Sequence, residues 1–89
     1  MTKSKKVTIH RDDQDSLILQ KFGENLRKIR EKAELSQEQV AYEAGFSRSY
    51  YTEVETGKRN ISLLNILKIC SFLKIEINDI IKLKDFSTK

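Results

Sequence analysis

Proline is absent from the 89 residues of this sequence, and glycine occurs only three times. Because proline interrupts helices and glycine weakens them, this scarcity favours an all-α fold. There is one cysteine, Cys70, so an internal disulfide and a zinc site built from several cysteines are excluded. No apolar run approaches the roughly 20 residues of a membrane span, and the N-terminus lacks the apolar core of a signal peptide. We therefore expect a small cytoplasmic protein made of helices.

Groups that carry catalysis are equally few. The only histidine, His10, lies in a polar N-terminal segment far along the chain from Cys70, and the acidic residues are interspersed with lysine and arginine. No nucleophile has a base near it in the sequence, so we expect no enzymatic activity, no metal and no cofactor. With 89 residues the chain forms one domain and leaves no room for a second domain that senses a small-molecule ligand.

Charge, by contrast, is plentiful. Charged residues make up 34% of the sequence and the net charge is +4, which suits an anionic partner, although many ordinary helical proteins are equally basic. Residues 1–15 have almost no apolar side chains, and we interpret them as a largely disordered tail before a domain over 16–84 and a short tail over 85–89. The alternative is a basic arm that reaches DNA through Lys3, Lys5, Lys6 and Arg11.

Serines mark the helix starts. Ser36, Ser47 and Ser62 can each cap a helix, and an apolar residue stands immediately before each serine and again four residues after it. Gln39 adds a capping box to the first of these starts, and Gly45 can end that helix in a left-handed conformation. We predict a compact bundle of five helices over 17–34, 37–44, 48–56, 63–73 and 77–83.

The helix predicted over 17–34 carries an apolar stripe at spacings of four, three and four, from Phe22 through Leu26 and Ile29 to Ala33. Such spacing is typical of a buried face. Gly23 lies beside this stripe and weakens an isolated helix. This indicates that a neighbouring element approaches closely here; the alternative is that the glycine is simply tolerated.

The centre of the sequence, from Ser36 to Gly57, reads SQEQVAYEAGFSRSYYTEVETG and predicts two short helices joined by a tight turn. At about 100° per residue, the polar side chains of the second helix fall within an arc of about 140°. One face can therefore hydrogen-bond and the other can pack, as a helix in a DNA major groove requires. The polar arc holds Arg48, Ser49, Thr52, Glu53 and Thr56, and the packing arc holds Tyr50, Tyr51, Val54 and Glu55.

The segment LRKIREKAELSQEQVAYEAGFSRSYYTEVETGKRNISLLNILKIC resembles the helix-turn-helix domain of the XRE family, the phage-repressor and Cro-like transcription regulators. Within that family, SRSYYTEVETGKRNISLLNI is most similar to the small controller proteins of restriction-modification systems. The sequence departs from the family at Tyr51, where an aliphatic residue is usual, and at Ile61, where many relatives have proline. The landmarks of the resemblance are Arg30, Leu35, Ser36-Gln37, Ala41, Gly45, Glu55-x-Gly57 and Arg59-Asn60.

Arg48 opens the second helix of the motif, and its guanidinium can bind guanine O6 and N7 together. An arginine at a helix start is otherwise unfavourable, because the helix dipole places positive charge there. Ser49 and Thr52 can reach bases or phosphates, and Glu53 can accept from cytosine N4 but repels phosphates unless it faces a base. The following loop either donates to the DNA backbone or is simply solvated, and its candidate residues are Lys58, Arg59 and Asn60.

The resemblance implies roles for further positions. It makes Gln37, at the start of the first motif helix, a phosphate clamp, and it places Tyr50 against the DNA. It also pairs Glu55, a carboxylate on the packing arc, with Arg30 in a partly buried, structural ion pair. The complete predicted DNA-binding set is Gln37, Ser47, Arg48, Ser49, Tyr50, Thr52, Glu53, Lys58, Arg59 and Asn60.

The helix predicted over 63–73 is more apolar than one packing face requires. We assign Leu63, Ile66, Leu67, Cys70 and Leu73 to the core face, which leaves other apolar side chains in this helix and after it. We predict that a second copy of the chain covers part of this surplus; the alternative is that these side chains only close the core. The predicted dimer interface holds Ile69, Phe72, Ile77 and Ile81, with Phe86 as a further candidate.

Together these patterns favour a sequence-specific DNA-binding transcription regulator that acts as a homodimer on an operator with two-fold symmetry. The competing interpretation is a protein-interaction module, such as an antitoxin whose apolar C-terminal surface covers a toxin. The polar arc around Arg48 separates the two, because it has no obvious purpose in the second. The expected partners are double-stranded DNA and a second copy of the chain, with no membrane.

Overall fold

The computed structural model describes the backbone of residues 3–86 and the side chains of residues 13–85. Its helices are α1 (Lys3–Lys32), α2 (Gln37–Ala44), α3 (Arg48–Glu55), α4 (Leu63–Leu73) and α5 (Ile77–Ile80), followed by the short 3-10 helix η1 (Leu83–Phe86). No strand occurs in this described part of the chain, and the predicted all-α fold with five α-helices is confirmed. Among the same residues, no helix is both long and apolar enough to span a membrane.

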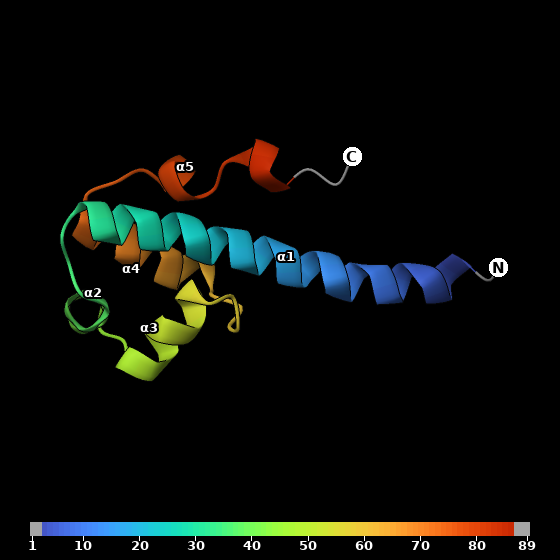
Figure 1. The fold of residues 1–89 in the computed structure, drawn as a ribbon, viewed down its shortest axis with the longest axis horizontal. Coiled ribbons are helices and arrows are strands. Elements are labelled where there is room, and N and C mark those ends of the chain that lie inside the picture. Colours follow the sequence, from blue (N-terminus) through green and yellow to red (C-terminus); the bar gives the residue numbers. More distant parts are fainter. Residues whose placement is uncertain (1–2, 87–89) are drawn as a thin grey trace.

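The long helix α1 is the spine of the molecule (Figure 1). Helix α3 packs against one side of α1, and α5 and η1 pack against the other. Helix α4 closes the bundle through contacts with α2 and α5. The N-terminal turns of α1 extend beyond the other helices, so the molecule is elongated, with principal extents of 49 × 25 × 20 Å. The motif helices α2 and α3 thus lie together on one side of α1.

The predicted bounds of the first and last helices are wrong. The helix expected over 17–34 begins at Lys3 and ends at Lys32, and the one expected over 77–83 ends at Ile80. No proline or glycine precedes Gly23, so nothing in the N-terminal stretch interrupts helical hydrogen bonding. The side chains of His10 and of the alternative basic arm lie outside the described residues. The division into a tail, a domain over 16–84 and a second tail stays a prediction.

The serine caps are confirmed. Ser36, Ser47 and Ser62 each accept a hydrogen bond from the backbone N–H three residues later, at 3.0, 3.1 and 3.2 Å. The side chain of Gln39 accepts from the N–H of Ser36 at 2.7 Å, which completes the capping box. Gly45 ends α2 with a φ of 82°, in the left-handed region. These local signals fix where the three central helices begin.

The apolar stripe of α1 is shorter than predicted. Phe22 and Leu26 are buried and Ile29 is half-buried, but Ala33 is exposed, because α1 ends one residue before it. The chain then turns at Glu34, which has a positive φ of 61°. The buried apolar core consists of Phe22, Leu26, Val40, Ala41, Ala44, Tyr51, Val54, Ile61, Ile66, Ile69, Cys70 and Ile80.

Gly23 is a point of close approach between α1 and α3, the first of the two possibilities that its place in the sequence left open. A Cβ at this position would lie 2.2 Å from the carbonyl oxygen of Glu55 and 2.7 Å from that of Val54. Backbone atoms cannot move aside as the end of a flexible side chain does. Glycine therefore allows α3 to pack directly against α1, which fixes the position of the second motif helix.

Candidate nucleic-acid interface

The turn between α2 and α3 sets the direction of α3. The N–H of Gly45 donates to the carbonyl of Tyr42 at 3.2 Å, and the N–H of Phe46 donates to that of Ala41 at 2.8 Å. A Cβ at Gly45 would meet nothing within 4 Å, so the left-handed backbone, and not lack of space, requires the glycine. Ser47 then caps α3 immediately after the turn.

The two faces of α3 have opposite environments. Tyr51 and Val54 are 0% and 1% exposed and belong to the core, whereas Arg48 and Ser49 at the start of the helix are exposed. Thr52 lies between the two faces and is half-buried. The arc predicted for DNA contact is thus exposed at Arg48 and Ser49 and half-buried at Thr52, while the packing arc is anchored to the bundle.

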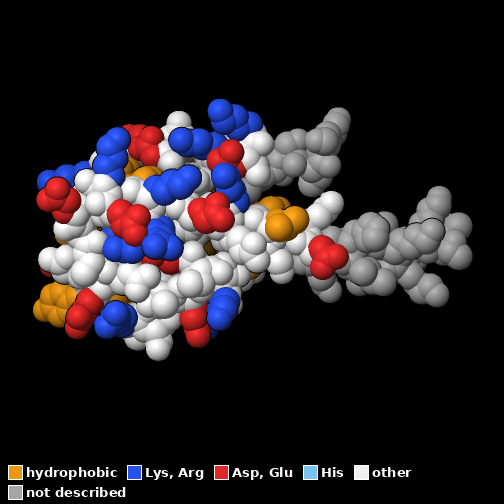
Figure 2. Space-filling view, in the orientation of Figure 1, with side chains coloured by type: hydrophobic (Ala, Val, Ile, Leu, Met, Phe, Trp, Pro, Cys, Tyr) orange, Lys and Arg blue, Asp and Glu red, His pale blue; other side chains and the backbone are white. Residues whose placement is uncertain are grey.

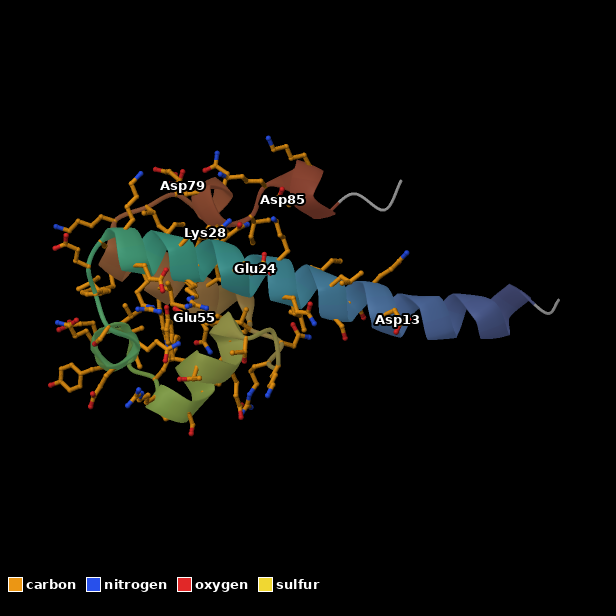
Figure 3. All side chains as sticks on the ribbon, viewed as in Figure 1. Asp13, Glu24, Lys28, Glu55, Asp79 and Asp85 are labelled. Atoms are coloured by element: carbon orange, nitrogen blue, oxygen red, sulfur yellow. The ribbon has the colours of Figure 1, made fainter. Side chains whose placement is uncertain are left out.

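A buried ion pair anchors the C-terminal end of α3. Arg30 on α1 binds Glu55 through two hydrogen bonds, from Nε to Oε2 at 2.6 Å and from Nη2 to Oε1 at 3.1 Å. The two side chains are only 10% and 2% exposed. The remaining Nη1 of Arg30 donates to the carbonyl of Leu35 at 2.7 Å, and Figure 3 shows Glu55 between α1 and α3. The structure therefore contains the ion pair expected from the resemblance.

Two more donors complete the surroundings of the Glu55 carboxylate. The hydroxyl of Tyr51 donates to Oε2 at 2.6 Å, and Nε2 of Gln37 donates to Oε1 at 2.9 Å. Burial alone would raise the pKa of Glu55, but the hydrogen bonds from Arg30, Tyr51 and Gln37 outweigh it and leave this pKa below its ordinary value. Burial, followed by the bond to Glu55, raises the pKa of Tyr51. The hydroxyl of Tyr51, the departure from the family pattern, thus has a defined partner.

Gln37 connects the two motif helices. Besides donating to Glu55, its side-chain oxygen accepts from the hydroxyl of Thr52 at 3.2 Å. The side chain is half-buried, and its amide is engaged on both sides by α3. Its predicted contact with phosphate stays a prediction; the structure adds a role in holding α2 against α3, which sequence spacing did not reveal.

A second cluster forms where the chain leaves α3. Nε and Nη2 of Arg59 lie 3.0 and 2.9 Å from Oε1 of Glu53, and the guanidinium carbon lies 5.1 Å from the centroid of the Tyr50 ring. The Tyr50 hydroxyl accepts from Nδ2 of Asn65 at 3.1 Å, and its ring meets Phe46 edge-on with centroids 5.1 Å apart. Three predicted DNA-binding residues are thus bound to one another.

The other predicted residues of this loop, Lys58 and Asn60, are exposed.

On the face drawn in Figure 2, Lys and Arg side chains are interspersed with Asp and Glu and form no continuous basic surface. Among the described residues, no three His, Cys, Asp or Glu side chains gather where they could hold a metal ion.

The dimer interface predicted from the sequence needs one correction. Ile69 is 0% exposed and lies in the core of its own chain, so it cannot contact a second copy. Phe72 and Ile81 are half-buried against that core, and Ile77 is 37% exposed. The side chain of Phe86 lies outside the described residues. Ile69 was misplaced because α4 is apolar on nearly every side, so periodicity cannot show which stripe faces inward.

Among the larger exposed apolar side chains of α4, Leu63 and Leu67 are ones that we had assigned to the core face, whereas Leu64 belongs to the apolar surplus. Leu63, Leu64 and Leu67 are 62%, 70% and 45% exposed. Leu64 and Leu67 line a groove of 490 Å³ between α2 and α4, which Phe72 and Ala44 also line. Leu63, Leu64 and Leu67, the α4 leucine face, form an apolar surface that nothing in the described chain covers.

The fold and the motif geometry define a helix-turn-helix protein, and the comparison with known families agrees: the helix-turn-helix family matches residues 26–80. The chain belongs to this family, of the XRE type, whose members are DNA-binding transcription regulators.

Its relatives include proteins of one particular kind. It is 44% identical over 61 residues to control protein C.MunI from Mycoplasma sp, covering 67% of this chain and 82% of that one. It is 41% identical over 68 residues to control protein C.BamHI from Bacillus amyloliquefaciens, covering 75% and 80%. The crystal structure of the restriction-modification controller protein C.AhdI from Aeromonas hydrophila matches with a TM-score of 0.68 and 48% identity, over 70% of this chain and 94% of that one. The resemblance stated from the sequence is confirmed.

Proposed function

We propose that this chain is a sequence-specific DNA-binding transcription regulator that acts as a homodimer on a palindromic operator, as a restriction-modification controller. The observation that carries the proposal is the contrast between the two faces of α3. Its packing face is bound to α1 and α2 through Glu55, and its opposite face presents Arg48 and Ser49 to solvent. A rigidly held helix with free polar side chains can enter a major groove without reorganising. The similarity to control proteins supports the controller role.

In this proposal the motif separates base contacts from phosphate contacts. Arg48 binds guanine, and Ser49 and Thr52 contact bases or phosphates near it. The loop after α3 donates to the backbone of the same duplex, and no catalytic step is required. The residues proposed to contact phosphate are Gln37, Lys58, Arg59 and Asn60, and those proposed to lie at or near bases are Ser47, Arg48, Ser49, Tyr50, Thr52 and Glu53.

The α4 leucine face supports the homodimer. Leu63, Leu64 and Leu67 expose apolar side chains on one helix, and Ile77 on α5 exposes another. A symmetric contact between two such faces buries this surface and holds two copies of α3 in a fixed relation. Two recognition helices must lie roughly 34 Å apart to enter successive major grooves on one side of B-DNA. A dimer of this kind accounts for the exposed apolar face, and its two-fold symmetry calls for a palindromic operator.

The same face is what the competing interpretation needs, because an antitoxin also covers a partner with an apolar surface. The exposed side chains of Arg48 and Ser49 favour the DNA-binding proposal, since they have no obvious purpose in a protein-interaction module. Gel shift with duplex DNA from upstream of the gene that encodes the chain tests the choice. We expect a shifted complex that survives added random DNA and contains two copies per duplex. A protein that shifts no duplex, or shifts all duplexes alike, contradicts the proposal.

A further inference from the structure

Glu53 and Arg59 lie six residues apart and are brought together by the turn that ends α3. The N–H of Lys58 donates to the carbonyl of Glu53 at 2.8 Å, and Gly57 adopts a φ of 79°. A Cβ at Gly57 would lie 2.8 Å from the Cα of Gln20 on α1, so the turn is pressed against the bundle and only glycine fits there. Because the chain turns back here, the guanidinium of Arg59 lies beside Glu53 in the last turns of α3.

The contact engages one particular edge of the guanidinium. Nε of Arg59 donates to Oε1 of Glu53 at 3.0 Å, and Nη2 lies 2.9 Å from the same oxygen. This edge is one that arginine offers to a phosphate as a pair of parallel donors. The guanidinium carbon lies over the Tyr50 ring, 5.1 Å from its centroid, and Nδ2 of Asn65 donates to the Tyr50 hydroxyl. The carboxylate of Glu53 therefore occupies one of the edges of Arg59 that a DNA phosphate can take.

We propose that Glu53 competes with DNA phosphate for Arg59 and so restrains binding to DNA that lacks the operator sequence; this inference rests on the proposed DNA-binding function. A phosphate gains the Nε–Nη2 edge of Arg59 only when Glu53 releases it. The released carboxylate then stands on the polar face of α3, where phosphate charge repels it.

The cost of that release depends on the DNA sequence. An operator that places the N4 amino group of a cytosine near Glu53 gives the carboxylate a donor to bind. Other DNA sequences offer the carboxylate no donor. Glu53 then either stays bound to Arg59 or lies unpaired beside the DNA. A repulsive element of this kind discriminates against wrong partners without adding affinity for the right one.

The test compares Glu53→Gln with the matched control Glu24→Gln, which removes the same charge from an exposed position on α1. An operator is first obtained by binding selection on random duplexes. Affinities for this operator and for a random duplex are then measured across a salt series, in the parent and in an Arg59→Ala background. We expect Glu53→Gln to tighten binding to the random duplex roughly two- to fivefold, the size of an exposed ion pair, and to steepen its salt dependence by about one unit of slope. Operator affinity should rise less, so the specificity ratio falls.

Two further results are expected. In the Arg59→Ala background, Glu53→Gln should change random-duplex binding no more than Glu24→Gln does. Without DNA, the NMR signal of the Arg59 Nε–H group should shift on Glu53→Gln and stay in place on Glu24→Gln.

The inference is overturned if the parent binds its operator but Glu53→Gln tightens random-duplex binding no more than Glu24→Gln does. It is also overturned if the gain persists without Arg59. A parent that binds no duplex at all would instead remove the proposed function itself, and this inference with it.

Discussion

Arg30 and Glu55 lie 25 residues apart in the sequence and form a two-bond ion pair, with Nε 2.6 Å from Oε2, in which the carboxylate is almost fully enclosed. The pair joins α1 to the C-terminal end of α3. Because every hydrogen bond of this carboxylate is made inside the protein, the orientation of α3 depends on it.

Glu55→Gln should be strongly destabilising, because it leaves the Arg30 charge buried without its partner. We expect the free energy of unfolding to fall by roughly 3–5 kcal/mol, measured by urea denaturation. The matched control is Glu31→Gln, which breaks the exposed pair of Arg27 and Glu31, whose side chains are 63% and 53% exposed. That change should cost less than about 1 kcal/mol. Equal effects of the two changes would mean that the buried pair contributes no more than a surface pair.

The free energy of unfolding should also depend on pH, because protonation of Glu55 weakens the ion pair. Its pKa is lowered in the folded protein, so its contribution is complete above the ordinary pKa of 4.5 and is lost as the pH falls through the lower folded value. Urea denaturation between pH 7 and pH 3 should show a steeper acid loss in the parent than in Glu55→Gln. If the unfolding free energies of the parent and of Glu55→Gln fall in parallel as the pH is lowered, Glu55 is not the group responsible for the acid loss.

Gly23→Ala should destabilise the fold, although alanine favours helices by roughly 0.5–1 kcal/mol over glycine. The added Cβ would lie 2.2 Å from the carbonyl oxygen of Glu55, so α1 and α3 must separate. Overpacking of this kind costs roughly 1–3 kcal/mol, and we expect a lower Tm in thermal unfolding. A variant that melts above the parent would show that the two helices are not in this contact.

Leu64→Asp should weaken dimerisation without unfolding the monomer. Leu64 is 70% exposed in the single chain, so a charge there is solvated until a second copy covers it. Sedimentation velocity at tens of micromolar should show a dimer for the parent and a monomer for the variant. Leu17→Asp, at a 63% exposed position on α1, is the control and should stay dimeric. A parent that sediments as a monomer contradicts the proposed assembly.

The parts of the fold that the sequence predicted are those set by local chemistry. The caps at Ser36, Ser47 and Ser62 and the turn at Gly45 need only neighbouring residues, so their patterns are visible in the sequence. The orientation of α4 was missed: Ile69, predicted at the dimer interface, is buried, and Leu67, predicted in the core face, is 45% exposed. Both side chains are apolar, so only tertiary packing decides which of them is buried.

For the candidate site, too, the sequence predicted some features and not others. The polar arc of α3 follows from helical periodicity, and the Arg30–Glu55 pair follows from the family resemblance. The partners of Gln37 and Arg59 did not follow, because they depend on how α2 packs on α3 and on how the chain turns at Gly57.

The central claim is that α3 reads DNA bases through Arg48, and the most direct test is to measure how Arg48→Ala changes discrimination. Binding selection on random duplexes first gives the operator, and the affinities of parent and variant are then measured for that operator and for each of its single base-pair substitutions. The account predicts that Arg48→Ala loses about 1–3 kcal/mol on the operator and no longer discriminates at one G·C pair. Lys58→Ala should instead weaken binding to every sequence alike and reduce the salt slope by about one. If Arg48→Ala discriminates at every base pair as the parent does, α3 is not the recognition helix.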